Sequence, residues 1–125
     1  MLIQIPLLFI LLVLQLGYNQ LEGKIPKELG SLRQLNAMSL QHNKLTGQIP
    51  LTLGNLEKLR MLYLSSNNFN GIIPATLADI ANLEVLDIQN NSLSGTVPSG
   101  MPLFLFHYSI VFFYTFGRTL INSLK

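Results

Sequence analysis

The stretch LTGQIP at Leu45–Pro50 occurs in four related copies along this chain. LEGKIP occupies Leu21–Pro26, FNGIIP occupies Phe69–Pro74 and LSGTVP occupies Leu93–Pro98. The copies begin at equal intervals along the chain, without insertion or deletion. A fixed period of about 20 to 50 residues is the signature of a solenoid built from stacked repeats. The recurring turn therefore predicts the corner of one rung rather than a functional site.

Each copy extends backwards into a longer unit that contains an apolar pair, two apolar residues separated by one other. Alternation with a period of two is typical of a short strand, and it points both side chains of the pair to the same side. Strands stacked about 4.8 Å apart would form a parallel sheet above a continuous aliphatic core. The four pairs are Leu14/Leu16, Met38/Leu40, Leu62/Leu64 and Leu86/Ile88.

An asparagine follows each apolar pair, where the chain must leave the strand. Its side-chain amide carries both donors and an acceptor, so a stacked column of asparagines can satisfy backbone groups from rung to rung. The glycine that comes next permits a bend that a Cβ would oppose, and the proline fixes φ on the return path. The predicted structural asparagine ladder consists of Asn19, Asn43, Asn67 and Asn91.

The full pattern LxxLxxLxLxxNxLxGxIPxxLGxL resembles the plant-specific class of leucine-rich repeats, over roughly Ile5–Pro98. The return segments IPKELGSL and IPLTLGNL carry the part that is specific to plants. That class occurs in the ectodomains of plant receptor-like kinases and receptor-like proteins. The resemblance implies a concave face that binds peptides, steroids or co-receptors, and a second small sheet at the IP segment.

Repeat pattern and resemblance together predict an α/β-type repeat solenoid. We expect a right-handed stack of plant-type leucine-rich repeats with one parallel sheet of about four rungs, short strands, and irregular or 3-10 return segments. Residues 1–7 are an apolar lead-in that could belong to a targeting signal, residues 8–98 hold the four repeats, and residues 99–125 form a divergent apolar tail.

The two apolar ends of the chain admit several interpretations. Residues 1–17 read as a signal peptide without a basic n-region, as a short membrane helix, or as repeat sequence, and their in-register leucines favour the repeat. Residues 101–117 read as a degenerate rung, as a weak membrane anchor or as non-homologous sequence. Membrane association through 1–17 or 101–117 is therefore an open expectation.

The chain departs from the family at both ends. Family ectodomains carry paired-cysteine caps, whereas this chain has no cysteine, and it has no kinase signature either. Since uncapped end rungs expose core leucines, we expect the chain to be a piece of a longer receptor.

Catalytic chemistry finds no support in the sequence. The histidines His42 and His107 pair with no carboxylate at triad or ligand spacing, and no phosphate loop or metal motif occurs. The net charge of +2 is scattered, without the basic stripe of a nucleic-acid-binding protein. We expect no enzyme activity, no cofactor, no metal site and no nucleic-acid partner.

Binding is better supported, because side chains that flank the inward leucines should line the concave face. Tyrosine and arginine are enriched in interface hot spots. We predict a partner-binding patch for a peptide or protein ligand, such as another leucine-rich repeat receptor; the alternative is a truncated receptor fragment with a structural role or no independent function. The predicted patch consists of Arg60, Tyr63, Glu84 and Asp87, with Gln41 and His42 as outer members.

One N-glycosylation acceptor occurs in the chain, Asn90-Asn91-Ser92. Because Asn91 belongs to the predicted ladder, Asn90 is the residue that a glycan could reach. The sequon, the apolar N-terminus and the resemblance favour a membrane-associated or extracellular location at the plant cell surface.

Overall fold

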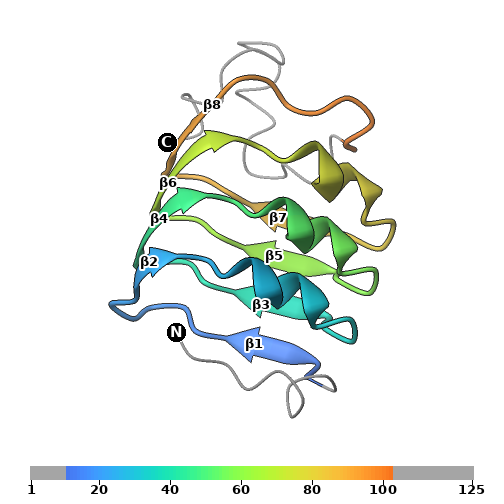
Figure 1. Ribbon diagram of the computed structural model, residues 1–125, viewed down its shortest axis with the longest axis horizontal. Coiled ribbons are helices and arrows are strands. Elements are labelled where there is room, and N and C mark those ends of the chain that lie inside the picture. Colours follow the sequence, from blue (N-terminus) through green and yellow to red (C-terminus); the bar gives the residue numbers. More distant parts are fainter. Residues whose placement is uncertain (1–10, 103–125) are drawn as a thin grey trace.

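The computed structural model describes residues 11–102 of the 125-residue chain. Four rungs stack on one another, each with one strand on either side of a corner and a short return segment (Figure 1). The strands are β1 (Val13–Gln15), β2 (Glu22–Lys24), β3 (Ala37–Ser39), β4 (Lys44–Gln48), β5 (Met61–Tyr63), β6 (Asn68–Ile72), β7 (Val85–Asp87) and β8 (Ser92–Ser94). The 3-10 turns of the return segments are η1 (Lys27–Ser31), η2 (Leu51–Asn55) and η3 (Ala75–Asp79).

The first sheet has the order β1-β3-β5-β7, and all its strands are parallel. The middle residues of the last three strands point into the core, and Met38 and Leu62 are fully buried. Leu40, Leu64 and Ile88 directly follow their strands and are at most 2% exposed. The predicted apolar pairs of these three rungs therefore both face the core, although only the first residue of each pair lies within the hydrogen-bonded strand.

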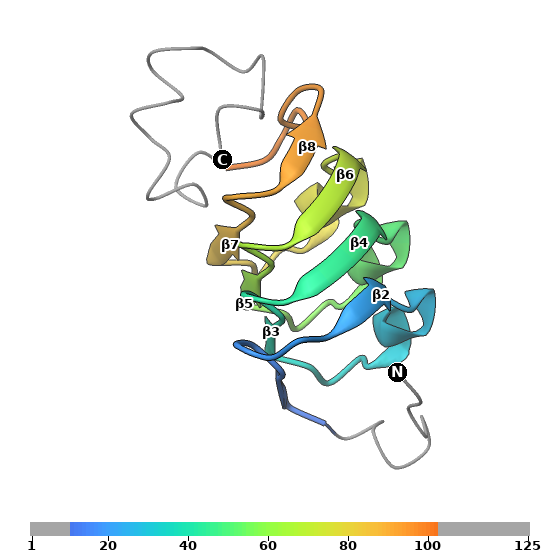
Figure 2. The ribbon, with the colours of Figure 1, turned by 90° about the vertical axis from the view of Figure 1, so that its left-hand side faces the viewer.

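A second parallel sheet has the order β2-β4-β6-β8 and lies around the corner from the first (Figure 2). The resemblance implies this sheet, whereas the period-two pattern predicts only the first. Its register differs from that of the first sheet, in which paired residues are one full repeat apart. In the second sheet the paired residues are less than one repeat apart: Gly23 pairs with Leu45, and Gly47 pairs with Phe69. The backbone of Gly47 is left-handed, with a φ of 79°. A side chain would oppose this conformation, which explains the glycine that precedes each Ile-Pro or Val-Pro.

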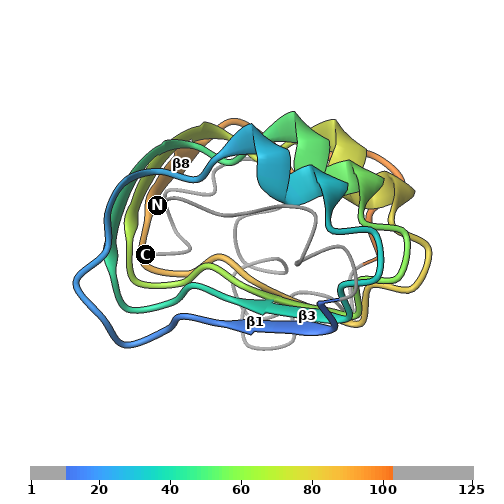
Figure 3. The ribbon, with the colours of Figure 1, turned by 60° about the horizontal axis from the view of Figure 1, so that its bottom comes forward.

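The core fills the space between the first sheet and the 3-10 turns, which lie on opposite sides of each rung (Figure 3). Each turn begins after a proline and buries one leucine. Neighbouring turns approach closely at Gly30 and Gly54, where a Cβ would clash with the carbonyl oxygens of Thr52 and Thr76. The glycine of the LGxL return is therefore needed for rung-to-rung packing.

Threonine hydroxyls join the same turns from outside the core. The Thr52 hydroxyl donates to the Lys27 carbonyl at 2.6 Å, and the Thr76 hydroxyl donates to the Leu51 carbonyl at 2.7 Å. At the equivalent position of η3, Ala78 replaces the glycine, and Gly100 stands where the next threonine would be. Ala78 therefore replaces the glycine in the one turn whose next neighbour has Gly100 in place of the threonine that the alanine Cβ would contact.

Buried asparagines connect each rung with the one before it. Asn67 accepts a hydrogen bond from the Leu45 backbone N–H at 3.0 Å and donates to the carbonyls of Leu40 at 2.9 Å and Leu64 at 3.2 Å. Asn43 and Asn91 make the equivalent bonds one rung earlier and one rung later.

Asn19, by contrast, is exposed in the structure. Its bonds, within the described part of the chain, go only to the Leu16 and Gly17 carbonyls of its own rung.

The fourth rung continues three residues beyond Pro98, where the sequence pattern ends the repeats. Met101 is 3% exposed, and its N–H donates to the Pro98 carbonyl at 3.3 Å, as the Leu77 N–H does to Pro74. The flexible thioether can fill a site that holds leucine in the other rungs. The rest of the tail, residues 103–125, lies outside the described range, and so does most of the candidate anchor 101–117.

We expect Asn67→Ala to destabilise the chain by about 1–3 kcal/mol, since it leaves the buried Leu45 N–H without its acceptor and removes hydrogen bonds to the Leu40 and Leu64 carbonyls. Asn43→Ala should behave similarly. Asn19→Ala is the matched control and should have a much smaller effect, because Asn19 is exposed. Urea unfolding followed by circular dichroism measures the difference; equal effects of Asn67→Ala and Asn19→Ala would contradict the bridging role.

Gly54→Ala should also destabilise the chain, by about 1–3 kcal/mol, because the new Cβ meets the Thr76 backbone, which cannot move away alone. Ala78→Gly at the equivalent position of η3 is the control, with an expected cost of at most about 1 kcal/mol. Urea midpoints of the two variants against the parent chain test this. A neutral Gly54→Ala would show that the turns do not pack tightly.

Candidate binding face

The solvent side of the first sheet corresponds to the concave face expected from the sequence. We call this surface the strand face; it is formed by the outward residues of β1, β3, β5 and β7 and by the residue directly before each of these strands. Because the middle residue of each strand points into the core, its two neighbours point outward. Residues at the same position of successive repeats are then neighbours on adjacent strands.

Arg60 and Glu84 stand directly before β5 and β7 and form an ion pair. The Arg60 Nε and one terminal nitrogen each donate to a Glu84 carboxylate oxygen at 3.1 Å. The hydrogen bond and the charge of Glu84 raise the pKa of the Arg60 guanidinium above its ordinary value. Both side chains are more than half exposed, so the pair is screened by salt and contributes little to stability.

Tyr63 and Asp87 are partners in the parallel register of β5 and β7. Both are half-buried. The Tyr63 hydroxyl points along its own strand to the Met61 sulfur, 3.7 Å away. One Asp87 carboxylate oxygen accepts from the Gln89 backbone N–H at 3.3 Å. The structure thus brings together four of the predicted patch residues, Arg60, Tyr63, Glu84 and Asp87, on two adjacent rungs.

Gln41 and His42 lie on the second rung, after β3, at the end of the strand face. Gln41 accepts a hydrogen bond from the Ser39 hydroxyl. His42 is exposed, and its ring stacks on Tyr18 with the centroids 4.4 Å apart. These two residues form a rim that is separate from the pair of rungs that carries Tyr63 and Asp87.

His42 belongs to a column in which every residue has a positive φ: Tyr18, His42, Ser66 and Asn90, with φ between 53° and 58°. Each stands directly before a ladder asparagine, and the left-handed turn leads the chain from the strand to that asparagine. Asn90, the sequon residue, is exposed, and its amide donates to the Ser66 hydroxyl at 3.1 Å.

The strand face also carries an apolar column that the sequence-based patch does not include. Its members share the position directly before the inward residue and pair in register from rung to rung. The sequence holds a signal for this column, because the position is apolar in all four repeats. The predicted patch instead takes its residues from the columns on either side, those of Arg60 and Glu84 and of Tyr63 and Asp87. We call this column the apolar stripe: Val13, Ala37, Met61 and Val85.

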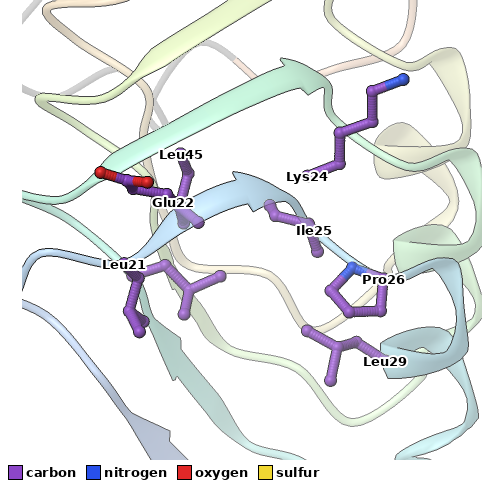
Figure 4. Close-up of a pocket in the computed structure, with 8 residues that line it drawn as sticks. Leu21, Glu22, Lys24, Ile25, Pro26, Leu29 and Leu45 are labelled. Carbon is purple, nitrogen blue, oxygen red and sulfur yellow. The ribbon is translucent and has the colours of Figure 1, made fainter. Parts of the chain in front are cut away.

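A small apolar cavity of about 110 Å³ lies under β2, at the N-terminal end of the described stack (Figure 4). Leu21, Ile25, Leu29 and Leu45 line it, with the charged Glu22 and Lys24 beside them. Leu21 is only partly buried, whereas Phe69 and Leu93, at the same repeat position of later rungs, are at most 1% exposed. We therefore attribute the cavity to the end of the core and not to a ligand site.

Residues 11–102 hold no group of three or more histidine, aspartate or glutamate side chains placed to bind a metal ion. The helices found in this range are the 3-10 turns of the return segments, and none is long or apolar enough to cross a bilayer. Of the apolar run 1–17, the described part, residues 11–17, contains β1, which pairs with β3 in the repeat register.

Comparisons with known proteins agree with this architecture. Sequence models of the leucine-rich repeat family match residues 11–32, 34–56 and 49–93. A search of curated protein sequences finds no match. Among solved structures, the plant peptide hormone receptor RGFR1 in complex with RGF2 is 36% identical, with a TM-score of 0.71 over 72% of this chain.

Two further structures are similar to this chain. A TDR receptor is 40% identical, with a TM-score of 0.69 over 72% of the chain. The BIR3–SERK2 complex from Arabidopsis thaliana is 39% identical, with a TM-score of 0.68 over 70% of the chain. The chain spans only 14%, 16% and 47% of the matched chains of RGFR1, TDR and the BIR3–SERK2 complex, respectively.

Four stacked rungs with parallel strands, joined by three 3-10 return turns, define a leucine-rich repeat solenoid of the plant type. The chain belongs to the leucine-rich repeat family, and the solved structures that it resembles include plant receptor ectodomains.

Proposed function

We propose that this chain is a non-catalytic interaction module that binds a peptide, or an extended segment of a partner protein, on its strand face. The apolar stripe carries the proposal. It is a continuous line of apolar side chains across four strands, in which Val13 is exposed and the other three are partly buried. Contiguous apolar surface of this kind is typical of an interaction site. The similarity to RGFR1, solved with RGF2, and to the BIR3–SERK2 complex supports a peptide or a receptor of the same family as the partner.

The size of the strand face favours a short ligand. Four strands span about 19 Å, which matches an extended segment of about six residues. A standard interface buries about 800 Å² on each partner, and the strand face is too narrow to supply this area comfortably. The chain alone is therefore suited to one short stretch of a ligand.

Val85→Lys should weaken peptide binding at least about tenfold, because the ligand would have to desolvate an ammonium group on the stripe. Peptides selected from a phage-displayed random library on the full chain supply the ligand, and isothermal titration measures the dissociation constant. Ile72→Lys is the matched control, since Ile72 is 59% exposed on the second sheet. Equal losses in both variants, or selected peptides insensitive to Val85→Lys, would contradict binding at the strand face.

We also propose that the chain enters the secretory pathway and resides at the membrane or outside the cell, with Asn90 as its glycosylation site. Asn90 is exposed, whereas Asn91 is buried and holds the Phe69 N–H and the Leu64 carbonyl. A glycan on Asn90 would replace one amide hydrogen and leave the ladder intact.

Expression in plant cells should give a band that shifts on glycosidase digestion, and Asn90→Gln should abolish the shift. Asn68→Gln is the control, because Asn68 is equally exposed but lies outside a sequon. An unshifted band together with a soluble cytosolic pool would contradict entry into the secretory pathway.

A further inference from the structure

The charges of the strand face are not balanced. Within the described residues, the strands of the first sheet and the positions directly before them carry three charged side chains, Arg60, Glu84 and Asp87. Arg60 and Glu84 neutralise each other through two hydrogen bonds. Asp87 is the remaining charge, so the face presents one negative group that a ligand can meet.

Asp87 can accept further hydrogen bonds. Its partner within the described structure is the Gln89 backbone N–H, which engages one carboxylate oxygen at a long 3.3 Å. An ionised carboxylate has about four acceptor sites, so most of its capacity is unused. A half-buried carboxylate beside apolar side chains also attracts a cation more strongly than one in bulk water.

The surroundings of Asp87 suit a long cationic side chain with an apolar stem. Tyr63 is its register partner on β5, and Val85 lies on the same strand two residues before it. Met61, in contact with the Tyr63 hydroxyl, pairs with Val85 and continues the apolar surface. Lysine and arginine place their methylene groups along such a surface and keep the charged head in a polar environment.

Arginine fits this arrangement better than lysine. Its planar guanidinium can donate two parallel hydrogen bonds to one carboxylate and can stack on an aromatic ring. Tyr63 supplies the ring and Asp87 the carboxylate, on adjacent strands about 4.8 Å apart. An acidic ligand residue at this place would meet the Asp87 carboxylate and would be repelled.

We propose that Asp87 and Tyr63, with Met61 and Val85 beneath the side-chain stem, form a subsite for an arginine residue of the peptide ligand. This proposal rests on the proposed function, since it specifies which residue of the ligand the strand face recognises.

Three tripeptides that differ only in the central residue test the subsite: acetyl-Leu-Arg-Leu-amide and its citrulline and glutamate counterparts. Citrulline matches the shape of arginine without its charge. Titration into the full chain with ¹³C-methyl-labelled methionine reports binding through the Met61 methyl signal. The arginine peptide should bind about tenfold more tightly than the citrulline peptide, the effect of one charge-assisted bidentate contact, and the glutamate peptide should bind most weakly.

Asp87→Asn should remove the preference for arginine over citrulline and leave the affinity for the citrulline peptide unchanged. Asp79→Asn is the matched control, because Asp79 is an exposed carboxylate at the end of η3 and should leave the preference intact. Tyr63→Leu should reduce the affinity for the arginine peptide several-fold through loss of the ring.

Two results would overturn the subsite: equal affinity of the parent chain for the arginine and citrulline peptides, or an arginine preference that survives Asp87→Asn. If library peptides still bind in a manner sensitive to Val85→Lys, only the subsite is wrong and the proposed function stands. If neither the library peptides nor the tripeptides affect the strand face, both proposals fail.

Discussion

The asparagine side chain that joins two rungs is the interaction on which the rest of this structure depends. In Asn43, Asn67 and Asn91, one carboxamide holds a backbone N–H and a carbonyl of the preceding rung and carbonyls of its own rung. These backbone groups stand at the end of a strand and would otherwise be buried without partners. An inserted or deleted residue would move the amide away from its partners, so the rungs must keep one length.

The constant rung length determines which surfaces are available for function. It places Leu62 against Met38 and Leu86, so the inward positions form one core. It also aligns the outward positions into columns, because neighbours in the first sheet are always one repeat apart. The strand face therefore arises from the same register that builds the core, and substitutions in its outward columns change its chemistry without loss of the fold.

Two of these columns have different chemical characters, and the selectivity that we propose for the strand face rests on their combination. The apolar stripe offers contact area for apolar contacts, which do not require a particular orientation of the ligand. Asp87 and Tyr63 offer a charge and an aromatic ring at one defined point. Arg60 and Glu84 satisfy each other and so limit the number of charges that a ligand must match. In the proposed function, a short face that cannot reach high affinity by area distinguishes one ligand residue from another in this way.

The sequence alone determined the period, the inward leucines, the glycine corners and the placement of Arg60 and Glu84 on one face, because residues one strict repeat apart become neighbours in the stack. Only the tertiary structure decided four other features. Asn19 is exposed although it has the ladder spacing, since its contacts in the described residues are confined to its own rung. Met101 extends the fourth rung because methionine fits a site that holds leucine in the other rungs. The second sheet pairs Gly23 with Leu45, which are less than one repeat apart, and the repeat length does not predict this register. The open carboxylate of Asp87 beside Tyr63 likewise depends on which hydrogen bonds the folded backbone makes, and no spacing encodes that.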